Sequence, residues 1–232
     1  MYIVIMLMYS FLFVVCIAFQ ELIPLNYNKE IMSSIIVRAY HSIGCIYYLT
    51  PILLKTEHAL MEVESTEMPS DVNFVLKRSA YFFLWDTFAL LMGNEKEKVV
   101  FTLHHLLSCF TISYSVYYEI NWYFVSIGLF LAEITNPTTQ ISEASTLFNY
   151  YNNTFEKFYF LFMLLIRGII SPCMVLLTLY DLKNLLSIHG EDVFNRSIII
   201  NYFTMISITL ASIDWLNNKY EEIIIEDNKR LN

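Results

Sequence analysis

Charged side chains are scarce in this chain. Only 16% of its 232 residues are Asp, Glu, Lys or Arg, whereas about 25% is typical of a soluble domain. Hydrophobic residues take their place, at 56% of the sequence, and the mean hydropathy is +0.50. Several apolar runs reach the roughly 20 residues that a helix needs to cross a bilayer. The composition therefore predicts an all-α, multi-pass integral membrane protein.

Sequence motifs of several common enzyme classes are also absent. The chain has no P-loop, no dinucleotide-binding fingerprint and no CxxC pair. It lacks the clustered histidine boxes of membrane oxygenases, so we expect no metal ion and no bound cofactor. Basic residues are outnumbered, with 14 Lys and Arg against 22 Asp and Glu, and the net charge of −8 argues against nucleic-acid binding.

Cysteines are few as well. The four cysteines all fall inside apolar runs: Cys16, Cys45, Cys109 and Cys173. A disulfide framework belongs to small secreted domains with closely spaced cysteines. We therefore interpret these residues as membrane-buried thiols.

The apolar runs predict about seven transmembrane helices. They cover residues 1 to about 24, 33–54, 72–92, 98 to about 118, 122 to the Asn-Pro pair at 136–137, 158–180 and 197–216. Pro172 should kink the sixth helix. The polar residues 138–157 predict an irregular or re-entrant segment followed by a loop. We divide the chain into a first helix and linker outside the core (1–32), a six-helix domain (33–216) and a charged tail without fixed structure (217–232).

Every predicted helix except the first carries a titratable or charged residue near mid-membrane. Such residues are costly in lipid, so they face protein or a water-filled cavity and pair with each other. The pattern predicts that the last six helices form a ring around a polar chamber. Arg38 or Arg167 could pair with Asp86 or Glu133. The residues that carry this prediction are Arg38, His41, Asp86, His104, His105, Glu133, Arg167 and Asp214.

Two adjacent histidines, His104 and His105, head the fourth helix. Positions i, i+4, i+7 and i+11 share one face of a helix, so His104 heads a polar stripe of Ser108, Thr111 and Ser115. His105 is turned roughly 100° away. We therefore expect His104 to face the polar interior and His105 to lie at its edge. The histidines could equally be hydrogen-bonded struts between helices.

The basic residues that flank the predicted helices give a direction in the membrane. Seven Lys and Arg residues lie on the side of the C-terminus and five on the opposite side. By the positive-inside rule this difference favours a cytosolic C-terminus. The helix depths then predict a chamber that opens toward the cytosol.

Three stretches resemble a known family. The residues Tyr81 to Asp86 (YFFLWD), His104 to Ser108 (HHLLS) and Leu131 to Pro137 (LAEITNP) are similar to the TLC domain, which ceramide synthases and translocating-chain-associating membrane proteins share. The resemblance covers about residues 33–216. It implies a barrel-like ring of six helices around a lipid-filled chamber, in a protein of the endoplasmic reticulum.

The motifs differ from those of ceramide synthases at four positions. Ser108 stands where a threonine follows the paired histidines, and Ala132, Glu133 and Asn136 stand where that family has His, Asp and a second Asp. The sequence is closer to the small TLC-domain proteins of lipid homeostasis. Arg38, His41 and Arg167 also resemble features of that branch.

Two functions fit these residues. One is acyl transfer from acyl-CoA to a lipid amine or hydroxyl, with His104 as base or nucleophile. In it Asp86 or Glu133 orients His104, His105 assists, and Arg38, His41, Ser108 and Arg167 bind substrate. The other is a non-catalytic lipid-binding, sensing or transport protein that regulates membrane lipid composition. Both take membrane lipids as partners, and neither fixes an oligomeric state.

Overall fold

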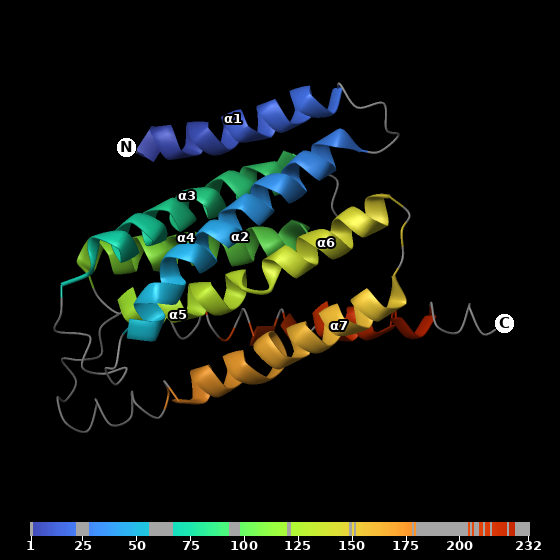
Figure 1. The fold of residues 1–232 in the computed structure, drawn as a ribbon. Coiled ribbons are helices and arrows are strands. Elements are labelled where there is room, and N and C mark those ends of the chain that lie inside the picture. Colours follow the sequence, from blue (N-terminus) through green and yellow to red (C-terminus); the bar gives the residue numbers. More distant parts are fainter. Residues whose placement is uncertain are drawn as a thin grey trace.

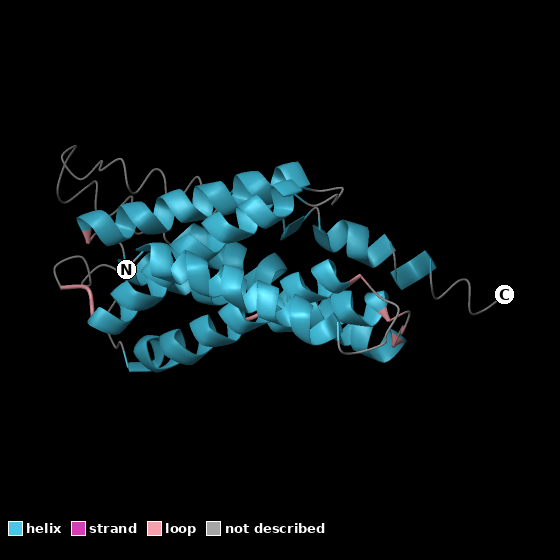
Figure 2. Cartoon of the chain, turned by 90° about the horizontal axis from the view of Figure 1, so that it is seen from above, coloured by secondary structure: helices cyan, strands magenta, loops and turns pink. Residues whose placement is uncertain are grey.

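The computed structural model describes residues 2–21, 28–55, 67–92, 98–119, 122–148, 150, 152–177 and 179, together with scattered residues between 204 and 225. Within these ranges the chain is helical, the loops are short, and no strand is present (Figure 2). The predicted all-α fold is therefore confirmed. The predicted last helix, including Asp214, lies largely outside the described residues.

The helices lie side by side with their long axes roughly aligned (Figure 1). They are α1 (Tyr2–Glu21), α2 (Lys29–Lys55), α3 (Ser70–Met92), α4 (Lys98–Tyr118), α5 (Trp122–Glu133), α6 (Asn136–Leu147), α7 (Asn153–Met163) and the π-helical segment η2 (Leu164–Ile170). The pair α3 and α4 packs most extensively, α1 covers α2 and α3, and α2 also contacts α5 and α6.

Side-chain caps begin two of these helices. The Asn28 side-chain oxygen accepts hydrogen bonds from the backbone N–H groups of Glu30 and Ile31, both at 3.1 Å. Asn152 does the same for Phe155 at the start of α7, also at 3.1 Å. Each cap satisfies N–H groups that have no partner inside the helix, which is worth about 1 kcal/mol.

The main hydrophobic core lies where α1, α2, α3 and α5 meet. Phe82 and Trp85 of α3 are buried there beside Val37 of α2 and Leu129 of α5. Tyr9 of α1 is completely buried in the same cluster. A second, smaller cluster joins Tyr159 and Met163 of α7 to Leu216.

Residues 136–147 form the helix α6, so the prediction of an irregular segment from residue 138 is wrong for this part. The physical reason lies in the two roles of Pro137. It ends α5 at Glu133, because proline has no N–H to donate to the carbonyl four residues earlier. It also begins α6, because it stands in the first helical turn, where its missing N–H is not needed and its fixed φ suits a helix.

The long helix at residues 153–177 contains a turn of wider winding. Its segment η2 (Leu164–Ile170) is π-helical and includes Arg167. The N–H of Ser171 and its hydroxyl both donate to the carbonyl of Ile166, five residues earlier. Pro172 follows directly and cannot donate to the carbonyl four residues before it, which explains why the regular ladder is interrupted here. The sequence predicted a kink at Pro172, and the structure has a π-helical segment shortly before that residue.

The start of the charged tail is helical, contrary to the expectation that residues 217–232 have no fixed structure. Residues 215–221 and 223–225 are helical, and Leu216 and Ile223 are buried. Lys219 holds this helix to α7 through Glu156, with Nζ 3.0 Å from the carboxylate. Residues 226–232 lie outside the described part of the chain.

One of the described helices, Asn153–Leu177, is long and apolar enough to cross a membrane on composition. Helices α1 to α4 contain 20, 27, 23 and 21 residues, which also reaches the length of about 20 that a bilayer requires. Polar residues such as His41 and Asp86 lower the hydropathy of α2 and α3. The described chain is thus all-helical, with one helix that could cross a membrane on length and composition, and the seven-span ring stays a prediction.

Candidate functional site

A partly open cavity lies among α3, α4, α5 and the helical residue Thr204. Most of its wall is apolar. The residues that line it are Phe83, His104, Ser108, Thr111, Ile112, Phe124, Val125, Gly128, Leu129, Ala132 and Thr204. A hydrocarbon chain fits such a surface, because burial of apolar area is what stabilises it there.

The polar stripe of α4 faces this cavity. His104, Ser108 and Thr111 all line it. The Thr111 and Thr204 hydroxyl oxygens are 2.8 Å apart, so these two groups satisfy each other. Among the described residues that line the cavity, His104 is the one with an ionisable side chain.

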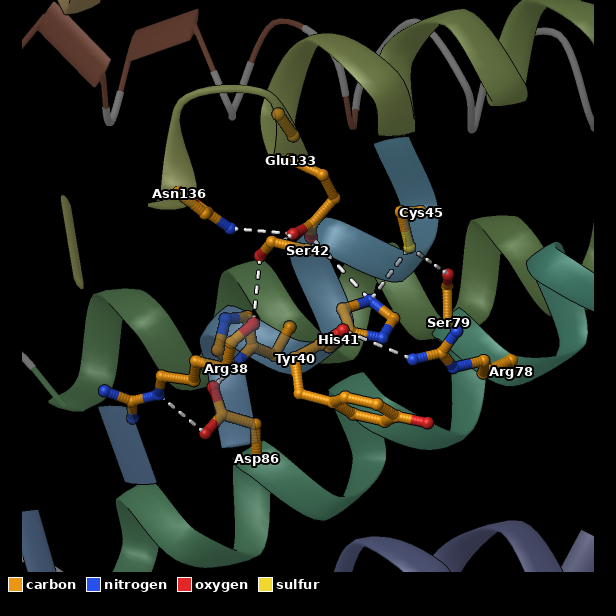
Figure 3. A network of polar contacts seen from close by, with 12 residues as sticks. Arg38, Tyr40, His41, Ser42, Cys45, Arg78, Ser79, Asp86, Glu133 and Asn136 are labelled. Atoms are coloured by element: carbon orange, nitrogen blue, oxygen red, sulfur yellow. Dashed lines mark hydrogen bonds and ion pairs between the residues drawn. The ribbon is translucent and has the colours of Figure 1, made fainter. Parts of the chain in front are cut away.

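Asp86 of α3 forms a cluster with Arg38 (Figure 3) and with His105. Its Oδ1 accepts a hydrogen bond from Nε of Arg38 at 3.0 Å. Its Oδ2 lies 3.4 Å from Nδ1 of His105, which is close enough for an electrostatic contact, although Nδ1 makes no hydrogen bond. Phe83 packs against both histidines, with its ring centroid 5.3 Å from that of His105 and 6.4 Å from that of His104.

Glu133 lies at the end of α5 and is 1% exposed. Its Oε2 accepts hydrogen bonds from the Ser42 hydroxyl at 2.5 Å and from the Asn136 side-chain amide at 2.9 Å (Figure 3). Its Oε1 lies 3.9 Å from Nε2 of His41. A buried carboxylate needs such donors to offset the loss of water.

Arg167 binds the break between α5 and α6. Its Nε donates to the Thr135 hydroxyl at 2.9 Å. One terminal nitrogen, Nη2, donates to the Ala132 carbonyl at 2.9 Å and to the Asn136 side-chain oxygen at 2.8 Å. The planar guanidinium thus serves three acceptors at the break, two side-chain oxygens and the backbone carbonyl of Ala132.

A third cluster surrounds His41 of α2, which is completely buried. The Tyr9 hydroxyl is 2.9 Å from Nδ1 of His41 and also accepts from Nε of Arg78 at 2.9 Å. Sequence reasoning missed both residues. Tyr9 stands in a predicted helix without charge, and Arg78 was counted among the charges that flank a membrane span. Nothing in an apolar run marks one tyrosine as the partner of a distant histidine.

The structure distributes the predicted site residues between this cavity and the polar networks beside it. His104 and Ser108 line the cavity, and Asp86 and His105 lie beside it with Arg38. His41, Glu133 and Arg167 belong to networks elsewhere and are not among the described residues that line the cavity. Asp86 and Glu133 contact other partners, and within the described chain neither carboxylate has a hydrogen bond or ion pair to His104. The expected orientation of His104 by a carboxylate is not found.

Residues 31–217 match the TLC domain family, which is most of the chain. The chain belongs to the TLC domain family. A comparison with curated proteins found no match. The TLC domain starts at the beginning of α2, so α1 precedes it although Tyr9 reaches into its core. Among the described residues, no group of three or more His, Cys, Asp and Glu side chains could hold a metal ion.

Asn136 stands at one of the four positions where the motifs of this chain differ from those of ceramide synthases. Its contacts show one structural effect of that difference. Its amide nitrogen donates to Glu133 and its oxygen accepts from Arg167. An aspartate at this position has no donor when it is ionised and would oppose the Glu133 carboxylate. The amide therefore joins the carboxylate of α5 to the guanidinium of η2.

Replacing Arg167 with alanine is expected to lower the free energy of unfolding by about 2–3 kcal/mol. The change removes three hydrogen bonds from a charged donor and leaves the groups at the break without it. Arg167→Lys should not restore the loss, because an ammonium cannot reproduce the planar fork. Thermal unfolding in detergent measures the change, with the exposed Lys157→Ala of the same long helix as control. Equal losses in the alanine variants would contradict this account.

Proposed function

We propose that this TLC domain binds the hydrocarbon part of a membrane lipid in the cavity among α3, α4 and α5, and that His104 transfers an acyl group there. The observation that supports the proposal is the position of His104. It places an imidazole in a wall whose other lining residues are mostly apolar. An acyl donor has a reacting group and a hydrocarbon chain, and these two parts need a polar group and an apolar surface next to each other.

The proposed reaction has two steps. An imidazole nitrogen of His104 attacks the thioester carbon of acyl-CoA, the carbon–sulfur bond breaks, and the CoA thiolate leaves. A lipid amine or hydroxyl then attacks the acyl carbon, the bond from that carbon to the imidazole nitrogen breaks, and an amide or ester forms. The acceptor's proton is taken up by the CoA thiolate, and His104 returns to its starting state. Alternatively, His104 removes a proton from the acceptor while the acceptor attacks the thioester directly.

The location of the remaining charges leads to a second candidate, a non-catalytic lipid-binding protein. In the described structure Asp86 lies with Arg38 and His105, and Glu133 lies with Ser42 and Asn136. Neither carboxylate supports His104 as a general base normally requires. A lipid sensor or carrier needs the cavity and no such support.

Mass spectrometry of the purified protein separates these functions. If acyl transfer is correct, incubation with acyl-CoA and total membrane lipid yields free CoA and a new acylated lipid, or a protein whose mass is increased by one acyl group. If the protein only binds lipid, a lipid co-purifies and no CoA is released. Absence of both lipid and turnover would reject the two proposals together.

Gly128→Leu is expected to reduce the amount of co-purified lipid at least severalfold. Gly128 lines the cavity on α5, so a leucine side chain there occupies space that the hydrocarbon would take. Leucine also favours a helix over glycine by up to about 1 kcal/mol, so the fold should survive. Ser113→Leu adds the same side chain on the exposed face of α4 and serves as control. Unchanged lipid content in Gly128→Leu would place the lipid elsewhere.

We further propose the seven-span arrangement, with six helices in a ring, in the endoplasmic reticulum and with a cytosolic C-terminus. The family resemblance supports the ring and the compartment, and the excess of basic residues supports the orientation. A cytosolic opening would admit acyl-CoA. Protease treatment of intact microsomes that carry a C-terminal epitope tag tests the orientation, because a lumenal tag would be protected.

A further inference from the structure

A chain of hydrogen bonds joins α1, α2 and α3. It starts at Arg78 on α3, passes through the Tyr9 hydroxyl on α1, and reaches Nδ1 of His41 on α2. On the other side of the imidazole, Nε2 lies 3.4 Å from the Cys45 sulfur, which is 3.3 Å from the Ser79 hydroxyl. Neither Tyr9 nor His41 is exposed to solvent, and Figure 3 shows the α2 and α3 side of this network.

The chemistry of the donors gives this chain a direction. A guanidinium has only N–H donors, so the Tyr9 oxygen must accept the bond from Arg78. The hydroxyl has a single hydrogen, and within the described structure its other partner is Nδ1 of His41. Tyr9 therefore donates to Nδ1, and that nitrogen is an acceptor without its own hydrogen. In a neutral imidazole the hydrogen then lies on Nε2.

We propose that Tyr9 is a positioning residue: held by Arg78, it fixes His41 in the tautomer that carries its hydrogen on Nε2. That hydrogen faces the Cys45 sulfur at 3.4 Å and the Glu133 carboxylate at 3.9 Å from Nε2. His41 thereby presents a donor toward Glu133, whose other oxygen is bound by Ser42 and Asn136. The first helix, which precedes the TLC domain, sets the electrostatic surroundings of a carboxylate inside it.

The sequence leaves room for this arrangement at Gly44. A Cβ atom there would contact Nη1 of Arg78 and lie 2.7 Å from Nη2 and 2.9 Å from Cζ. Only glycine allows the guanidinium this close to α2, where it also lies 5.0 Å from the centre of the Tyr40 ring.

The imidazole ring of His41 is also held by packing. It is stacked on the ring of Phe82, with centroids 3.8 Å apart and planes 11° apart. The ring is thus held in orientation as well as hydrogen-bonded at both nitrogens.

Solid-state NMR tests the assignment on the full chain in phosphatidylcholine liposomes, with histidine labelled by 13C and 15N. Nδ1 is bonded to Cγ and Nε2 to Cδ2, so nitrogen–carbon correlations show which nitrogen carries the hydrogen. The spectrum of His41→Asn identifies the resonances that belong to His41. We expect an unprotonated Nδ1 and a protonated Nε2 in the wild type. A hydrogen on Nδ1 of the wild type would overturn the proposal.

Tyr9→Phe provides the second measurement. The variant keeps the ring that packs on Phe82 and Trp85 and removes only the hydroxyl, so the fold should be retained. The resonance of Nδ1 should shift, because Nδ1 no longer accepts a hydrogen bond from the Tyr9 hydroxyl. Gly44→Ala should shift it by less, since it displaces only Arg78. The exposed Tyr47→Phe is the matched control. An unchanged Nδ1 resonance in Tyr9→Phe would refute the role of Tyr9.

These measurements do not involve turnover. The tautomer assignment can therefore fail while acyl transfer is observed, or hold while acyl transfer is absent.

Discussion

Replacing Asp86 with alanine is expected to lower the free energy of unfolding by about 3–5 kcal/mol. The Asp86 side chain is 3% exposed and that of Arg38 is 17% exposed, with the pair joined at 3.0 Å. Removing one member of a buried pair leaves the other charge without its compensation, which is why the loss is large. In a domain of this size each kcal/mol changes the midpoint of thermal unfolding by about 2–4 °C, so the effect is readily measured in detergent.

A double-mutant cycle distinguishes the ion pair from a general effect of truncation. If the pair acts as described, Arg38→Met with Asp86→Leu should cost less than the sum of the single changes, since the double variant leaves neither charge buried. Asp71→Ala provides the control, because Asp71 lies at the exposed start of the same helix. Additive losses, or an equal loss in Asp71→Ala, would be incompatible with the pairing.

Helix positions and helical phase could be predicted from the sequence because both follow from local rules. Apolar runs located α1 to α5 to within a few residues. The 3.6-residue period placed His104, Ser108 and Thr111 on one face, and these three residues line the cavity. The same phase turned His105 away, and the structure places it at Asp86.

Partners between helices could not be predicted in the same way. The sequence allowed Arg38 or Arg167 to pair with Asp86 or Glu133, and the choice depends on how each helix is rotated and placed. Arg38 pairs with Asp86, while Arg167 binds the backbone and side chains at the α5–α6 break. Glu133 is instead satisfied by neutral donors. Such selection depends on tertiary packing, which no single helix encodes.

The errors at both ends of the domain have a common cause. Tyr9 lies in a helix with no charge, and the residues after 217 form a highly polar segment, so composition assigned both to the periphery. Contacts between residues far apart in the sequence tie both segments to the rest of the fold. Arg78 and His41 bind Tyr9, and Glu156 binds Lys219. A hydroxyl or a lysine gains its structural role only when its partner is brought near.

His104→Ala should abolish acyl transfer while the protein stays folded and still binds lipid. The imidazole is the nucleophile or base of the proposed reaction, and its loss removes the group that forms or breaks bonds. Removing a general base alone typically costs about 10²–10⁴ in rate. The cavity remains, since its other lining side chains are unchanged, so co-purified lipid should persist. Release of CoA and thermal unfolding are measured on the same preparation.

The neighbouring His105→Ala provides the matched comparison. His105 does not line the cavity within the described structure and lies at the Asp86 carboxylate. Its loss should therefore reduce stability through the charged cluster and lower turnover by less than the loss of His104. If His105→Ala eliminates turnover and His104→Ala does not, the reacting histidine has been assigned to the wrong face of α4. If wild type and His104→Ala release CoA at the same rate, His104 has no catalytic role and the lipid-binding function is favoured.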